Sequence, residues 1–229
     1  MKRYITKSNT FIILLLFSLP VFSQTKVYEG TINRKYNIEM HLNFTNKTIH
    51  GYYFYKTKHL PIALFGEING TKVKLVESDL IDTSIFFQGV ISEMNIHGHW
   101  KDISKKKELN FSLKQIEAID SNKNYLIKNG DYENKGNSGK YSKYCSIYYI
   151  DKNLLYYEFS IANYNCDGQV FGIAQLEKNE LAKSLKISNV QGDCSLIFTF
   201  SSNKIKVEEK ECDSYHGASC TFGGEFINK

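Results

Sequence analysis

Apolar and polar residues alternate one by one through much of the first half of this chain, and this pattern constrains the fold more than any other feature. In the segment 38–44, Ile38, Met40, Leu42 and Phe44 are separated by single polar residues. A period of two predicts a half-buried β-strand, because successive side chains of a strand point to opposite faces. We therefore expect an all-β protein.

The segment 62–77 predicts a β-hairpin. Strand-like residues lie on both sides of Asn69-Gly70, and Asn-Gly readily supplies the two positive φ angles of a type I′ turn. With that turn, Glu67 faces Lys72 and Phe65 faces Lys74. About eight strands follow one another in this half, at 27–34, 38–44, 48–56, 62–68, 71–77, 84–91, 94–101 and 108–117. Such a meander predicts an up-and-down barrel or a sandwich.

The cysteines divide the chain into two parts. None lies between positions 24 and 144, whereas all five lie between Cys145 and Cys220. Halves that are stabilised so differently indicate two cores. We expect a first antiparallel β-domain at 24–118, a polar linker at 119–141 that is rich in Asn, Lys, Gly and Ser, and a second, disulfide-bearing β-domain at 142–229.

The first 23 residues have the pattern of a secretory signal peptide. Lys2, Arg3 and Lys7 precede an apolar run at 11–19, and Ser23 offers a small residue at the expected cleavage point. The run is shorter than the ~20 residues that span a bilayer. The sequence therefore predicts a secreted or periplasmic protein that does not span the membrane.

Secretion makes disulfide bonds the expected use of the cysteines. In a hairpin with strands at 195–200 and 205–210, the register brings Cys194 within reach of Cys212. This bridge would close a loop of about 18 residues, worth roughly 3 kcal/mol in the chain-entropy description. Cys166 with Cys220 is the second expected pair. Cys145 then remains as a free thiol or a link between chains.

The charge of the chain argues against nucleic-acid binding. The leader holds three of the 29 basic residues and none of the 24 acidic ones, so its removal lowers the net charge from +5 to +2. Arg34 is then the only arginine. Proteins that bind nucleic acids need clustered basic side chains, with arginine preferred for contacts to bases.

The sequence gives little support to catalysis. His97 and His99 share a face of a predicted strand, but a metal site would need further ligands, such as His41 or His50 from another strand. His216 lies between two cysteines in a Gly- and Ser-containing loop, which is a poor basis for a nucleophilic site. We expect no enzymatic activity, no cofactor and no metal, with a hydrolase as the least favoured alternative.

Aromatic residues are the remaining signal. The chain has 16 Tyr and 15 Phe, and runs such as 52–55 place rings on both faces of a strand. One face fills a core, while the other faces solvent, a cavity or a partner. We expect Tyr52, Phe54, Tyr215 and His216 to form a binding surface, the last two within the loop between Cys212 and Cys220.

Two family resemblances add to this interpretation. The stretch from Tyr28-Glu29-Gly30 through Gly98-His99-Trp100 is similar to the calycin barrels, the avidins and lipocalins, although their biotin contacts have no counterparts here. The part from Cys194 through Gly223-Gly224-Glu225-Phe226 resembles small periplasmic lysozyme-inhibitor domains.

These observations favour a non-catalytic protein of the cell envelope that binds a protein or a glycan. Inhibition of a wall-degrading enzyme is one specific form of this function. The alternative is a carrier whose first barrel holds a small apolar molecule against inward-facing Tyr and Phe. A carrier needs a lined cavity, whereas a binding module needs a filled core and an exposed contact surface.

Overall fold

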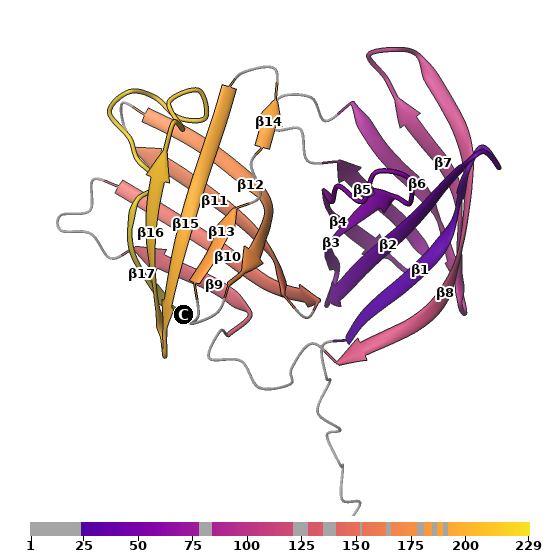
Figure 1. Ribbon diagram of the computed structural model, residues 1–229, viewed down its shortest axis with the longest axis horizontal. Helices are drawn as coiled ribbons and strands as arrows, with labels where there is room; N and C mark the ends of the chain where they lie inside the picture. The colour runs from indigo at the N-terminus through magenta and orange to yellow at the C-terminus, as the bar shows by residue number, and fades with distance from the viewer. Residues whose placement is uncertain are drawn as a thin grey trace, which may run out of the picture.

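The computed structural model describes residues 24–77, 84–120, 128–134, 141–151, 153–163, 166–177, 181–184, 187–189 and 192–229. The expected signal peptide at 1–23 lies outside these residues. All described secondary structure is β, and the strands form two antiparallel domains that lie side by side (Figure 1). The predicted fold class is therefore confirmed. Within the described ranges, no helical segment has the length and apolar character that a membrane crossing requires.

The first domain is a closed barrel of eight strands in sequence order, with β1 paired to β8. Its strands are β1 (Gln24–Ile32), β2 (Tyr36–Thr45), β3 (Thr48–Tyr55), β4 (Ile62–Asn69), β5 (Lys72–Glu77), β6 (Ile85–Ser92), β7 (Asn95–Asp102) and β8 (Lys107–Asp120). Closure pairs both edges of the meander and leaves no exposed edge strand.

The β4–β5 hairpin forms as expected, but its turn lies one residue further along the chain. Gly70 has a φ of 60°, whereas Asn69 is not in the left-handed region, and Asn69 pairs directly with Lys72. A glycine in the first central position is typical of a type II′ turn. Glu67 consequently faces Lys74 rather than Lys72. The same side chains still point inward and outward, because each residue's cross-strand partner lies two positions away from the expected one.

Aromatic and aliphatic side chains fill the barrel. Tyr53, Phe111 and Phe87 meet in edge-to-face contacts, with the Phe87 ring centre 5.2 Å from each of the other two. Leu64 and Leu75 are buried in the same cluster. The carboxylate of Glu77 also lies in this interior, and it accepts hydrogen bonds of 2.7 Å from Tyr53 Oη and from Trp100 Nε1.

The second domain is a curled sheet of nine strands in the order β13-β12-β11-β10-β9-β17-β16-β15-β14. The short strand β13 pairs with β12 at one end of the sheet. It also pairs with β15, which lies next to the strand at the other end. The strands are β9 (Gly130–Asn134), β10 (Tyr141–Asp151), β11 (Leu154–Asn163), β12 (Cys166–Leu176), β13 (Leu181–Ser184), β14 (Ile187–Asn189), β15 (Gly192–Ser201), β16 (Lys204–Lys210) and β17 (Gly224–Asn228).

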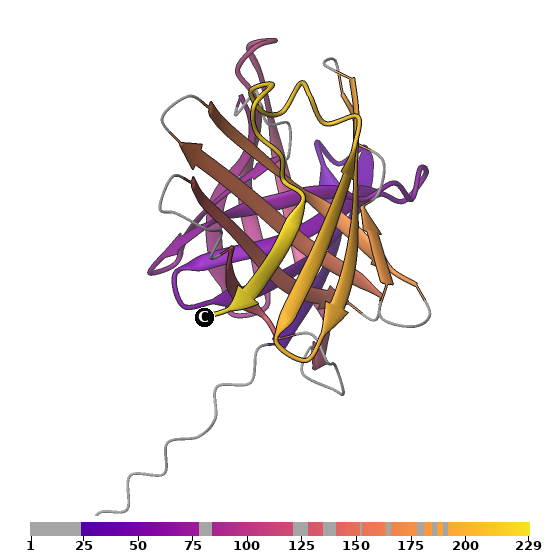
Figure 2. The same cartoon turned by 90° about the vertical axis from the view of Figure 1, so that its left-hand side faces the viewer.

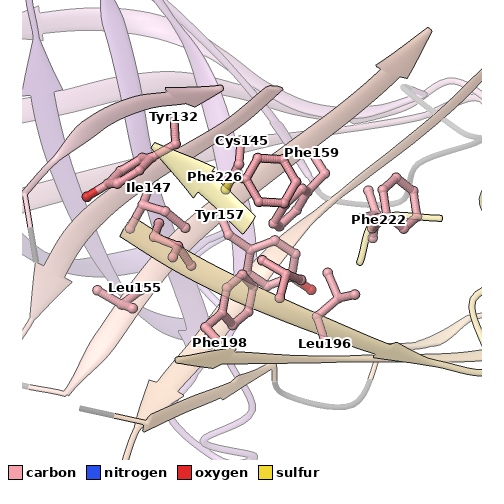
Figure 3. Packing of buried hydrophobic residues seen from close by; sticks show 14 of the residues in the cluster. Tyr132, Cys145, Ile147, Leu155, Tyr157, Phe159, Leu196, Phe198, Phe222 and Phe226 are labelled. Carbon is pink, nitrogen blue, oxygen red and sulfur yellow. The ribbon is translucent and has the colours of Figure 1, made fainter. Parts of the chain in front are cut away.

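A second aromatic core lies inside this sheet (Figure 3). Phe159 is at its centre, with its ring 5.8 Å from that of Phe198 and 5.4 Å from that of Phe226. The fully buried thiol of Cys145 belongs to the same cluster. Each domain therefore has its own core, as the distribution of cysteines indicates.

The segment expected to be a linker, 119–141, contributes to both sheets. Strand β8 continues to Asp120, and β9 (Gly130–Asn134) lies between β10 and β17 in the second sheet. The positions between them, 121–127, and those at 135–140 lie outside the described residues. Pairing with the next strand, β10, and with the distant strand β17 places β9 in the sheet despite its polar composition.

The two domains meet through the outer faces of β2, β3 and β4 on one side and of β10, β11 and β12 on the other. A third cluster of buried side chains joins them, made of Tyr52, Ala63, Ile150, Tyr156, Phe171 and Ile173. Phe65 of the first domain contacts Phe171 of the second with ring centres 5.3 Å apart. In Figure 2 the second domain faces the viewer, with the first domain behind it.

Candidate functional site

Two disulfides hold the segment 211–223, which we call the cysteine loop. Cys194–Cys212 ties its first residues to β15, and Cys166–Cys220 ties its last part to the start of β12. Cys194–Cys212 is the pair expected from the hairpin register, and Cys166–Cys220 is the second expected pair. The fifth cysteine, Cys145, is a buried free thiol. Disulfides are typical of proteins from oxidising compartments.

Backbone contacts fix the middle of the cysteine loop against β12. The amide of Gln169 donates to the carbonyl of Tyr215, and the amide of Gly217 donates to the carbonyl of Asp167 at 3.2 Å. Gly168 bridges to His216, and a Cβ at this glycine would lie 2.4 Å from Cβ of His216. A residue without a side chain is therefore needed where the loop crosses the strand.

Tyr215 and His216 are anchors of the cysteine loop rather than its contact residues. Both are buried, and His216 packs edge-on against Phe222 with ring centres 4.9 Å apart. Its Nε2 lies 3.4 Å from a carboxylate oxygen of Glu209, and that oxygen also accepts a 2.6 Å hydrogen bond from the amide of Phe222. The expectation that these two residues form an exposed surface is wrong, because the loop folds their side chains inward.

The outer side of the cysteine loop is polar and small. Its exposed residues are Glu211, Asp213, Ser214, Gly217, Ala218, Ser219 and Thr221. Seven exposed positions on a segment with two disulfides and two buried rings form a fixed, protruding surface. In Figure 1 this loop lies at the upper left of the second domain, away from the first domain.

Tyr52 and Phe54 lie at the domain junction. Tyr52 is buried there, its ring stacks on that of His41 with centres 4.6 Å apart, and its hydroxyl donates to Asp151 of the second domain. Phe54 is half-buried beside the same stack. Tyr52 is therefore not part of an exposed binding surface, because the second domain covers it.

Two histidines of the first domain also face the second domain. His50 stacks on Tyr148 with ring centres 3.9 Å apart, and burial lowers the pKa of its imidazole to about 4. His41 lies between Glu39 and Asp151, with nitrogen–oxygen distances of 2.8 and 3.3 Å. Burial lowers the pKa of His41, but the hydrogen bonds and charges of Asp151 and Glu39 outweigh that effect and raise it.

His97 and His99 lie together on the outer face of β7, as the alternation predicts. The nearest acid contact is that of His99, whose Nδ1 is 3.0 Å from Glu108. Neither His41 nor His50 joins them, because both are buried at the junction. Among the described residues, no group of three or more His, Cys, Asp or Glu side chains is arranged to hold a metal ion.

Comparison with protein-family models, with curated proteins and with solved structures finds no match for this chain.

Proposed function

We propose that this chain is a non-catalytic binding protein of the cell envelope, exported to the periplasm or beyond, which presents the cysteine loop to a protein partner. The observation that carries the proposal is the construction of this loop. Disulfides, backbone hydrogen bonds and inward-facing Tyr215 and His216 hold it in one conformation. Binding by such a loop avoids the entropic cost of ordering a flexible segment.

The exposed residues of the cysteine loop suit insertion into a cleft. Gly217, Ala218 and Ser219 are adjacent and small, so the chain is narrow at this point. Asp213 adds a charge on the same loop. We infer that the partner is an enzyme with a concave active site, and that the protein inhibits a wall-degrading enzyme by covering that site.

The alternative functions have less support from the side-chain arrangement. A carrier would need free space inside the first barrel, whereas Tyr53, Phe87 and Phe111 pack against one another there. A hydrolase based on His97 and His99 would need a third group near them, and the described residues offer only the carboxylate of Glu108 beside His99. A filled core and a fixed surface loop favour binding.

Inhibition assays test the proposal directly. We would measure hydrolysis of purified cell wall by muramidases, amidases and endopeptidases, with and without the oxidised protein. Wild-type protein should slow one of these classes, and Ala218→Trp should weaken that inhibition at least tenfold because the larger side chain blocks entry into the cleft.

A bulky residue elsewhere in the same domain provides the control. Ser202 is exposed in the turn between β15 and β16, so Ser202→Trp should inhibit like wild type. The proposal fails if wild-type protein inhibits none of the three enzyme classes, or if Ala218→Trp and wild type inhibit equally.

A further inference from the structure

A groove of about 520 Å³ crosses β4, β5, β6 and β7 on the outer face of the first barrel. Strand register arranges its walls as two parallel rows of exposed, outward-facing side chains. One row consists of Asn69, Lys72, Val90 and His97, and the other consists of Glu67, Lys74, Gln88 and His99. Four adjacent strands make each row about 14 Å long.

The floor of the groove runs between the two rows along Val73, Gly89 and Gly98, which pair with one another across β5, β6 and β7. The β6 and β7 backbones approach closely here, since a Cβ on Gly98 would lie 2.1 Å from the carbonyl oxygen of Gln88. Val73, Gly89 and Gly98 face the barrel interior, so backbone forms the floor, and the longer outward-facing side chains of the two rows stand on both sides of it. The result is a trough that crosses the strands.

Positive charge flanks this trough. Lys72 and Lys74 extend from β5 into opposite rows, and within the described part of the chain neither ammonium forms a salt bridge with a carboxylate. The ammonium of Lys74 lies 5.1 Å from the centre of the Phe86 ring, on the side of its row away from the trough, and Glu67 is its cross-strand neighbour. An anionic group in the trough would have Lys72 on one side and Lys74 on the other, with the Lys74 side chain turned from Phe86 towards the trough.

The rest of the lining accepts hydrogen bonds as well as donating them. Gln88 and Asn69 carry amides, His97 and His99 carry imidazoles, and Glu67 carries a carboxylate that only accepts. A ligand rich in carboxylates alone would leave Glu67 opposite a like charge. A ligand that combines hydroxyl groups with spaced carboxylates satisfies both the lysines and the acceptors.

We propose that this groove binds an acidic polysaccharide, with a uronic-acid carboxylate between Lys72 and Lys74 and sugar hydroxyls on Gln88, Glu67 and the two histidines. The site is independent of the function proposed for the cysteine loop, which belongs to the other domain. Figure 1 shows β5, β6 and β7 in the right-hand domain and the cysteine loop at the far left.

Calorimetric titration of the oxidised protein with a hexamer of galacturonic acid tests this assignment. We expect saturable binding at low salt that weakens as salt is added, because the lysine contacts are ionic. Lys72→Gln combined with Lys74→Gln should weaken binding at least tenfold. The uncharged hexamer of glucose should not bind, since it lacks the carboxylates.

Two further titrations separate a built site from general attraction of anions. Lys204→Gln with Lys206→Gln removes two exposed lysines of the second domain and should leave the affinity unchanged. A hexamer of glutamic acid should bind at least tenfold more weakly than the acidic sugar. The proposal is overturned if the acidic sugar does not bind, if both lysine pairs matter equally, or if the acidic peptide binds as tightly.

Discussion

At the residue scale, the most consequential side chain is Glu77. It lies inside the first barrel, where a carboxylate is costly unless it is hydrogen-bonded. Tyr53 and Trp100 supply those bonds. Burial is the main effect that raises the pKa of the Tyr53 hydroxyl well above its usual value, and the negative charge of Glu77 adds to it. The phenol therefore stays protonated, and remains a hydrogen-bond donor, at neutral pH.

Removing one of these donors should destabilise the barrel. Tyr53→Phe keeps the ring contacts but leaves the buried carboxylate without one hydrogen bond, a loss of about 1.5–3 kcal/mol for a bond to a charged group. Urea unfolding measures this difference. Tyr36→Phe, at an exposed position, is the matched control and should change stability by less than about 0.5 kcal/mol. Equal stability of the two variants would show that Glu77 does not depend on Tyr53.

At the scale of elements, alternation and turns predicted most strands but not their tertiary contacts. The segment 38–44 is part of β2, and 62–77 forms the β4–β5 hairpin. The turn type differs because Gly70 alone takes a positive φ, and either turn is compatible with the same two faces. Local sequence therefore specifies the faces of a strand more strongly than its register.

The burial of Tyr215 and His216 could not be predicted from their own segment. A loop of Gly, Ser and Asp normally lies in solvent. Here the loop is held against the protein by a bridge between His216 and Gly168, which lies almost fifty residues earlier in the chain. Glu77 was missed for a similar reason, since Trp100 and Tyr53 lie on other strands. In both cases the signal is a pairing between distant segments.

The Cys194–Cys212 bridge should contribute substantially to the second domain. It closes a loop with a sequence separation of 18, for which the chain-entropy description gives about 3 kcal/mol. We expect the double variant Cys194→Ala, Cys212→Ala to lose stability of this size, measured by urea unfolding of the oxidised proteins. If stability is unchanged, the packing of β15 against β16 alone holds this part of the loop.

At the scale of the whole molecule, the junction contains two histidines with opposite responses to pH. His50 has a lowered pKa, so its protonation opposes the docked state as the pH falls from 6.5 towards 4. His41 has a raised pKa, so its contribution is complete below pH 6.5 and is lost as the pH rises through the raised value. The groups around His50 are Tyr148, Tyr156 and the charge of Asp131.

Replacement of His50 should remove its part of the pH dependence of stability. His50→Phe retains a ring against Tyr148 but removes the proton-binding group, so the loss of stability between pH 6.5 and pH 4 should shrink by about 3 kcal/mol. Unfolding measured across this range provides the test. His97→Phe, outside the junction, should keep the wild-type pH dependence. An unchanged slope in His50→Phe would show that His50 is not buried at the junction in solution.

The free thiol of Cys145 can be used to detect opening of the second domain. The side chain is fully buried. Burial is the main effect that raises the pKa of the thiol well above its usual value, and nearby acidic groups add to it. In the folded structure the thiol is therefore inaccessible and protonated. A thiol reagent can react only when the sheet around it opens. The rate at which the reagent labels this single sulfur atom therefore measures how often the aromatic core of the native protein opens, without any mutation.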